Sequence, residues 1–221
     1  VRIYLFSSPG VILGRTQDEW DVRDKSCKVT RRFTGGSAVY VDEHSIGYSV
    51  FGRLDDIDPS AAIPIQIPYR EVTDKVASAL KSFGLTIGME RHWGLTLGGK
   101  VIAGHAKRYS AKTYEVHGLM RYTRWDMDVL KSTLRLRKKG THNGTAYILI
   151  DEDVFDLEGK VAGVHHSQVK IVRDEYAELM AAPGLDEYGV AKDELIARLA
   201  KSLAKAAPSD LPTELAKRAQ D

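Results

Sequence analysis

The stretch Arg31-Arg32-Phe33-Thr34-Gly35-Gly36-Ser37-Ala38-Val39-Tyr40-Val41-Asp42 decides which fold is expected of this chain. Two arginines end a predicted strand, Lys28–Arg32, a turn of small residues follows, and a second predicted strand, Ala38–Val41, begins at once. Glycine can adopt positive φ and lets backbone N–H groups approach a ligand closely. Arginine adds a permanent planar cation that suits phosphate or carboxylate. From the residues alone, an anion cradle and an ordinary glycine hairpin with two solvated arginines are equally good interpretations.

Strand-like and helix-like segments surround this stretch. The clearest helix is Tyr69–Phe83, because its apolar residues recur every three or four positions and Gly84 follows as a stop. Gly98-Gly99 predicts a hairpin turn. The other predicted strands are Val1–Phe6, Val11–Leu13, Ser45–Phe51, Leu95–Leu97, Val101–Ala103 and Lys112–Tyr122. The other predicted helices are Asp126–Leu134 and segments near His166–Met180, Lys192–Ala206 and Pro212–Ala219.

Length and composition limit the classes of protein to consider. The chain has 221 residues with a formal net charge of +2, so no overall field favours nucleic acid as a partner. The single cysteine, Cys27, permits no internal disulfide, and no apolar run is long enough to span a bilayer, so we expect a cytoplasmic protein. The composition becomes rich in alanine and lysine after about residue 165. We therefore expect a catalytic domain over 1–165 and a helical segment over 166–221.

Five motifs together resemble those of the lipoate–protein ligase family, within the superfamily of biotin/lipoate ligases and octanoyltransferases. Arg31–Asp42 resembles its arginine–arginine–x–threonine/serine–glycine–glycine–glycine–alanine–valine signature. The other four motifs follow the family's order and approximate spacing over residues 1 to about 134. They are Val11–Gln17, Ile102–Ala106, Val116–Gly118 and Trp125–Leu130.

The resemblance implies an α/β (α+β) fold, in which helices flank a mixed sheet and the C-terminal part is helical. It implies that ATP, with Mg, activates lipoate or another short acyl acid, and that the acyl group passes to a lysine of a lipoyl carrier domain. Lys100 is the implied catalytic residue. The implied residues for binding substrate and adenylate are Arg32, Thr34, Gly35, Gly36, Ser37, Ala38, Gly104, His105, Ala106 and His117. No metal ligands are predicted, since His165 and His166 lack companions at zinc spacing.

The chain departs from the family pattern at several positions. The family lysine falls at Val101, and Lys100 is one position earlier, which in a strand means the opposite face. A β-bulge at Gly98-Gly99 is predicted to turn Lys100 inward. Ser37 replaces the third glycine of the signature. The strand and helix that precede this region in the family are expected to be absent before Val1, and a second protein chain that replaces them is an open alternative.

Other functions remain open at this stage. The chain can be a non-catalytic acyl-binding paralogue or one subunit of a two-part ligase. Octanoyl transfer through Cys27 is a third interpretation, disfavoured because no base is evident beside the thiol. Arg135, Arg137, Lys138 and Lys139 form a basic run that we interpret as a solvated helix end, with docking of an acidic carrier domain as the alternative.

Overall fold

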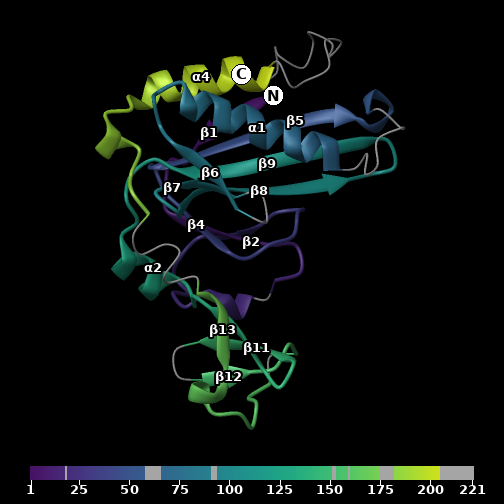
Figure 1. Cartoon of the computed structure of the whole chain (residues 1–221), viewed down its shortest axis with the longest axis vertical. Coiled ribbons are helices and arrows are strands. Elements are labelled where there is room, and N and C mark those ends of the chain that lie inside the picture. The colour runs from purple at the N-terminus through teal and green to yellow at the C-terminus, as the bar shows by residue number, and fades with distance from the viewer. Residues whose placement is uncertain are drawn as a thin grey trace.

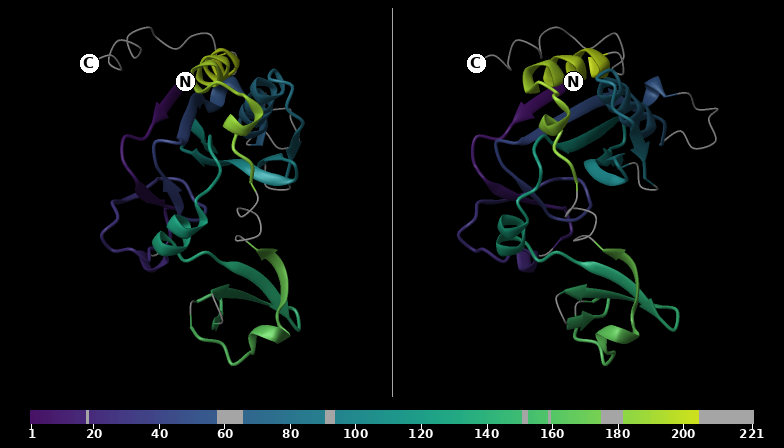
Figure 2. Two further views of the ribbon diagram at one scale, coloured as in Figure 1. Left: turned by 90° about the vertical axis from the view of Figure 1, so that its left-hand side faces the viewer. Right: turned by 60° about the vertical axis from the view of Figure 1, so that its left-hand side comes forward.

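The computed structural model describes residues 1–17, 19–57, 66–90, 94–150, 153–158, 160–174 and 182–204. The chain is built in layers (Figure 1). Helices α1 (Ile67–Lys81) and α4 (Lys192–Ala204) lie above a six-stranded sheet, and a three-stranded sheet with α2 (Met127–Thr133) lies below it. A four-stranded sheet stands apart at the lower end, and the two turned views in Figure 2 keep this order.

The six-stranded sheet is antiparallel throughout and has the order β1-β5-β9-β8-β7-β6. Its long central strands pair over their whole length, from Ser45↔Arg121 to Arg53↔Thr113. The strands are β1 (Arg2–Leu5), β5 (Ser45–Arg53), β6 (Ile87–Met89), β7 (Leu95–Leu97), β8 (Lys100–Tyr109) and β9 (Thr113–Arg121). Gly98 and Gly99 both have positive φ, as a tight turn between β7 and β8 requires.

Two smaller sheets complete the strand pairing. β2 (Gly10–Leu13) pairs parallel with β3 (Val29–Arg31) and antiparallel with β4 (Val39–Val41), so the predicted mixed pairing occurs here. The four-stranded sheet has the order β12-β11-β10-β13. Its strands are β10 (Lys138–His142), β11 (Thr145–Ile150), β12 (Asp153–Phe155) and β13 (Lys170–Asp174). Short 3-10 helices occur at Glu19–Asp21, Leu54–Asp56, His166–Gln168 and Asp186–Tyr188.

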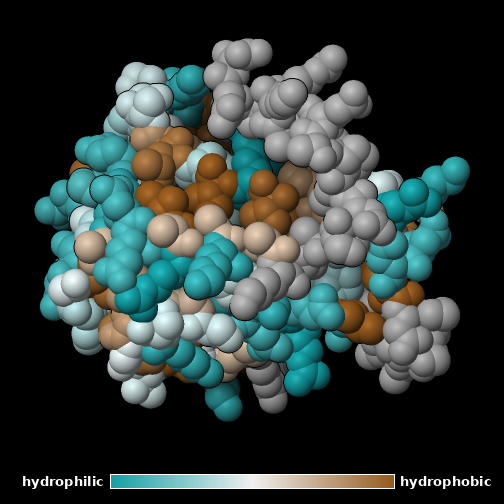
Figure 3. All heavy atoms as spheres, turned by 90° about the horizontal axis from the view of Figure 1, so that it is seen from above, coloured by the Kyte–Doolittle hydropathy of each residue, from teal (hydrophilic) through white to brown (hydrophobic). Residues whose placement is uncertain are grey.

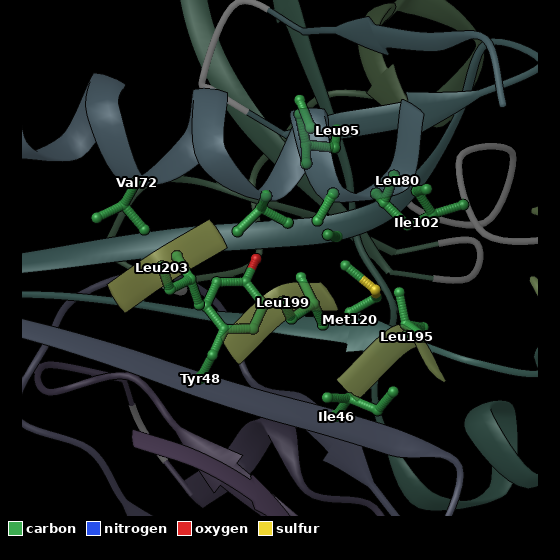
Figure 4. Packing of buried hydrophobic residues seen from close by; sticks show 14 of the residues in the cluster. Ile46, Tyr48, Val72, Leu80, Leu95, Ile102, Met120, Leu195, Leu199 and Leu203 are labelled. Carbon is green, nitrogen blue, oxygen red and sulfur yellow. The ribbon is translucent and has the colours of Figure 1, made fainter. Parts of the chain in front are cut away.

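The main core fills the space between the six-stranded sheet and its two helices (Figure 4). Alternation along each strand directs Tyr48 of β5 and Met120 of β9 to this side, where both are buried. Leu195, Leu199 and Leu203 of α4 pack into the same cluster at helical spacing. A second cluster packs β2 and β4 against α2, and a third, smaller one lies within the four-stranded sheet.

Most of the predicted elements, and the fold class, are confirmed. The predicted helix near His166–Met180 is wrong over its described part, because His166–Gln168 forms a single 3-10 turn and Lys170–Asp174 pairs with β10. The capping box of His165 and Gln168 closes that turn. The four-stranded sheet thus takes strands from both sides of residue 165. The helix predicted near Pro212–Ala219 lies outside the described residues.

The surface over α4 is partly apolar. Seen from above in Figure 3, hydrophobic residues gather in one area with hydrophilic residues around them. Leu5 and Val1, in and beside the edge strand β1, are among the large apolar residues that are exposed. Within the described part of the chain, no helix is long and apolar enough to cross a bilayer.

Candidate functional site

Arg32 holds the glycine turn from inside. Its guanidinium donates hydrogen bonds to the carbonyl oxygens of Gly35 (2.8 and 3.2 Å), Ser37 (2.8 Å) and Ile12 (3.0 Å). The pKa of Arg32 is lowered by its burial, yet the guanidinium keeps its charge because its ordinary pKa is so high. Arg32 therefore fixes the shape of the turn, which differs from the direct ligand contact that the resemblance implies.

The N–H groups of the same turn are left available. Within the described residues, no hydrogen bond is donated by the backbone N–H of Gly35, Gly36 or Ser37, and all three residues are exposed. Gly36 has φ +97°, a conformation that L side chains rarely adopt. Successive N–H groups in such a turn form a concave anion-binding nest. The carbonyls are bound to Arg32 on one side, and the donors remain for a ligand on the other.

Arg31 anchors the neighbouring loop. Its Nη1 donates to the carbonyls of Gly14 (3.0 Å), Arg15 (3.5 Å) and Gln17. A Cβ on Gly14 would overlap with the carbonyl oxygen of Gly36, so this position needs glycine for the close approach of β2 to the turn. Arg15, Thr16, Gln17, Glu19 and Arg31 line an open hollow of about 440 Å³ beside the turn. The loop and the glycine turn are thus joined by direct contacts.

Thr34 connects the turn to the main sheet. Its side chain is buried, and its Oγ1 lies 2.6 Å from Nε2 of His117 on β9, a residue 83 positions away in sequence. Burial, and then the charge of Arg32, lower the pKa of His117 from 6.5 to about 4. His117 is therefore neutral at pH 7, and its imidazole can share a hydrogen bond with the Thr34 hydroxyl without a net charge in the site.

The sheet face under the turn is lined by small residues. The register pairs Ala106 with His117 and Gly104 with Leu119, so the side chains of Ala106, His117 and Leu119 lie on the face opposite α1, and Gly104 leaves that face open. Gly104 is exposed, and a Cβ added there would meet nothing within 4 Å. The glycine turn, Thr34 and His117 thus border an open strip of sheet whose backbone a ligand can approach closely.

Arg108 is a functional candidate that the sequence reasoning missed. It lies two residues beyond Ala106 on the same strand, and therefore on the same face. Its guanidinium carbon is 5.0 Å from the ring centre of Phe33, which is 70% exposed within the signature stretch. This cation–π contact places an exposed positive charge at the rim of the site.

Lys100 and His105 lie on the other side of the sheet. Lys100 pairs with Leu97, whose side chain is in the core, whereas Val101 pairs with Thr96 on the site side. The register shifts between Leu95 and Thr96, where the partner on β8 steps from Ala103 to Val101, so the bulge lies there and the one predicted at Gly98-Gly99 is wrong. This bulge reverses the alternation along β8 and turns Lys100 to the side of the sheet opposite Gly104. His105 faces the core, where Tyr48 Oη lies 2.7 Å from its Nε2. The predicted site roles of both residues gain no support from these positions.

A family model now adds to this geometry. The model for the lipoyl protein ligase A/B catalytic domain matches residues 1–173, which is most of the chain. The chain belongs to the lipoyl protein ligase A/B catalytic domain family. The signature turn, the Thr34–His117 contact and the small residues of β8 therefore lie within the matched catalytic domain of the lipoyl ligase family. The resemblance expected from the five motifs is confirmed.

Individual relatives agree with this membership. The chain is 28% identical over 116 residues to a probable lipoate-protein ligase A of Mycoplasma pneumoniae, a match that covers 50% of the chain and 32% of that relative's length. A crystal structure of a lipoate-protein ligase A bound with ATP superposes with a TM-score of 0.62 at 20% identity, over 93% of this chain and 71% of that one. A structure from a bi-partite lipoate protein ligase of Thermoplasma acidophilum superposes with a TM-score of 0.61 at 18% identity, over 96% of this chain and 72% of that one. At such identities these structures show the lipoyl ligase fold.

The half-buried His117 makes the stability of this ligase-family domain depend on pH. The folded protein holds His117 neutral down to about pH 4, whereas the unfolded chain protonates it near 6.5, so the unfolded state binds more protons between these values. The stabilisation is complete above pH 6.5 and is lost as the pH falls toward 4. We expect His117→Gln to reduce the difference in unfolding free energy between about pH 7.5 and 4.5 by roughly 2–3 kcal/mol, measured by urea denaturation. An equal pH dependence in both proteins would contradict this assignment.

Proposed function

We propose that the chain activates lipoate with ATP at the glycine turn and transfers the acyl group to a lysine of a lipoyl carrier domain. The observation that carries this proposal is the set of backbone N–H groups at Gly35, Gly36 and Ser37, which donate no hydrogen bond to any described residue, while Arg32 holds the carbonyls of Gly35 and Ser37. Such preorganised donors suit the negative charge that develops when a carboxylate oxygen bonds to the α-phosphorus and pyrophosphate leaves. Mg would accompany the phosphates.

The residues around the turn take different parts in this proposal. The N–H groups of the turn bind the phosphate or the carboxylate, and Arg108 at the rim adds a positive charge on the same face. Gly104 and Ala106 leave room for the acyl chain along the sheet. Thr34 and His117 fix the turn against that sheet without adding charge. Arg31 and Arg32 position the backbone. In the transfer step the amine of the carrier lysine attacks the acyl carbonyl carbon, so that an amide forms, the bond to the phosphate oxygen breaks and AMP leaves.

A product assay tests this function directly. The purified chain is incubated with ATP, Mg, lipoate and an isolated E2 lipoyl domain, and the mass of the domain is measured. We expect the mass of one lipoyl group to be added only when both ATP and lipoate are present. An unmodified domain, in a reaction where a known ligase modifies it fully, would count against the proposal.

A second candidate is favoured by one observation. Val101 is on the site side where the family has a lysine, so this chain can be a lipoate-binding subunit that needs a second chain for efficient activation. The bi-partite ligase from Thermoplasma acidophilum is a precedent for a ligase in two parts. Octanoyl transfer through Cys27 has less support, because burial and the neighbouring Asp24 raise the pKa of this thiol.

Two substitutions test the importance of the missing lysine. Val101→Lys places an ammonium on the site face, and we expect it to raise the rate of adenylate formation about 10-fold, a part of the roughly 10²–10³ typical of one well-placed donor. Lys100→Ala should change that rate less than about threefold, because Lys100 lies on the core side. Pyrophosphate release without acceptor measures both. Near-complete loss of activity in Lys100→Ala would restore Lys100 as the catalytic residue.

A further inference from the structure

One face of the four-stranded sheet carries a basic row. The register places Phe155, Ile148, Lys139 and Arg173 side by side across the four strands. The next row on the same face contains Ala146, Thr141 and Lys170. The opposite face holds Leu149 and Val154 in the small core. We call the part of the first face made by Lys139, Thr141, Ala146, Lys170 and Arg173 the basic face.

The basic face holds like charges in register. Lys139 lies directly opposite Arg173 on the neighbouring strand. Lys170 adds a third cation two positions along the same face. Asp153 lies at the other edge of the sheet, on β12. The face therefore presents three cations, and a surface of this sign suits an acidic partner.

The rest of the basic run is already engaged by the chain itself. Arg135 stacks on Trp20, with 4.6 Å from its guanidinium carbon to the ring centre. Arg137 forms an ion pair with the buried Asp21. Lys138 pairs with Asp174 at 3.6 Å. Lys139 and Lys170 are exposed, and neither has an ion pair within the described part of the chain. The sequence suggested a solvated helix end, but Lys138 and Lys139 begin β10, whose alternation places them on opposite faces.

The remaining part of this face, at Phe155, contacts residues next to the candidate site. Phe155 contacts Trp20 with ring centres 5.6 Å apart, and Trp20 belongs to the 3-10 helix Glu19–Asp21. That helix directly follows the loop that Arg31 anchors, and Glu19 lines the hollow beside the glycine turn. Trp20 thus links the sheet that carries the basic face to the loop beside the glycine turn.

We propose that the basic face docks the acceptor, a carrier domain whose surface around its target lysine is acidic. This inference rests on the proposed function for the identity of the partner, whereas the location and charge of the surface come from the register and the ion pairs. Charge complementarity of this kind acts mainly on the encounter of the two proteins. The basic face therefore governs use of the acceptor and leaves the chemistry with lipoate and ATP unaffected.

The test reverses the charge at the two exposed lysines of the basic face. Lys139→Glu with Lys170→Glu is compared with the control Lys81→Glu, an exposed lysine at the end of α1 on the far layer. With an isolated E2 lipoyl domain as acceptor, we expect the double reversal to raise KM for the domain about 10-fold or more at low salt, with a smaller effect at high salt. Pyrophosphate release without acceptor, and the effect of Lys81→Glu, should stay near wild type.

Two further measurements separate docking from folding and from the proposed function. Lys139→Glu should keep or raise the unfolding temperature, because it replaces a like-charged pair with an opposite-charged one beside Arg173. NMR titration of ¹⁵N-labelled lipoyl domain with the chain measures docking even if no product forms. Weaker binding of the lipoyl domain by the double variant supports the inference. Recovery of that binding with a lipoyl domain that carries lysines in place of two acidic residues beside its acceptor lysine supports it too. The inference would be overturned if the double variant changed the binding and KM no more than Lys81→Glu does.

Discussion

Replacing Gly104 with valine is expected to abolish lipoate binding while the free energy of unfolding stays almost unchanged. Gly104 is exposed on the strip of sheet beneath the glycine turn, and an added Cβ meets no protein atom within 4 Å. A β-branched side chain suits a strand, so the fold tolerates the change. The same side chain would occupy the space through which the acyl chain approaches the sheet. We expect Kd for lipoate, measured by calorimetry, to rise at least about 100-fold, or roughly 2.7 kcal/mol.

Gly163→Val is the matched control for this substitution. Gly163 also has open space around it and lies in the segment between β12 and β13, away from the glycine turn. Gly163→Val should leave both the Kd for lipoate and the free energy of unfolding near the wild-type values. Normal lipoate affinity in Gly104→Val would mean that the ligand lies elsewhere, and the site would have to be moved from this face of the sheet.

Arg32→Ala is expected to have the largest effect on stability and activity together. The guanidinium binds three carbonyl oxygens, two of them within the turn, and its loss leaves these acceptors without their partner. We expect a loss of roughly 2–4 kcal/mol in unfolding free energy, since bonds to charged groups contribute about 1.5–3 kcal/mol each and solvent recovers part of that. Pyrophosphate release should fall by at least about 100-fold, because the N–H groups lose their arrangement.

Arg32→Lys and Arg53→Ala distinguish position from charge. A lysine keeps the positive charge but lacks the planar fork that reaches Ile12, Gly35 and Ser37, so it should restore little activity. Arg53 is exposed in an ion pair with Asp55, and its loss should cost less than about 0.5 kcal/mol. Full activity in Arg32→Lys would show that charge alone matters, and the positioning role of Arg32 would be wrong.

The sequence predicts the glycine turn well because its chemistry is local. Arginines, glycines and two short strands follow one another within a few residues, and each has a strong conformational preference. The Thr34–His117 contact joins residues 83 positions apart, so only the family resemblance could place them together. The helix predicted near His166 fails for a similar reason. Lys170–Asp174 contains β-branched residues that suit a strand, but its partner β10 lies far upstream along the chain, with Thr141 pairing to Lys170 and Lys138 to Asp174.

The faces of β8 show where alternation helps and where it misleads. Arg108 follows Ala106 by two residues, so simple alternation places it in the site, and this signal was available in the sequence. His105 lies between Gly104 and Ala106, and the same alternation turns it into the core. For Lys100 the sequence indicates that a bulge decides which face the side chain takes, but it does not indicate the position of the bulge. In the structure the bulge lies opposite Leu95 and Thr96, and this position is set by the pairing of β8 with β7.

Exchange of labelled pyrophosphate into ATP tests the central claim most directly, because it reports reversible adenylation without any acceptor or second chain. The purified protein is given ATP, Mg and labelled pyrophosphate, with and without lipoate, beside Gly104→Val. We predict exchange that depends on lipoate in the wild type and is lost in the variant. No exchange with lipoate, combined with no binding of lipoate or ATP by calorimetry, would contradict the assignment of adenylate chemistry to the glycine turn.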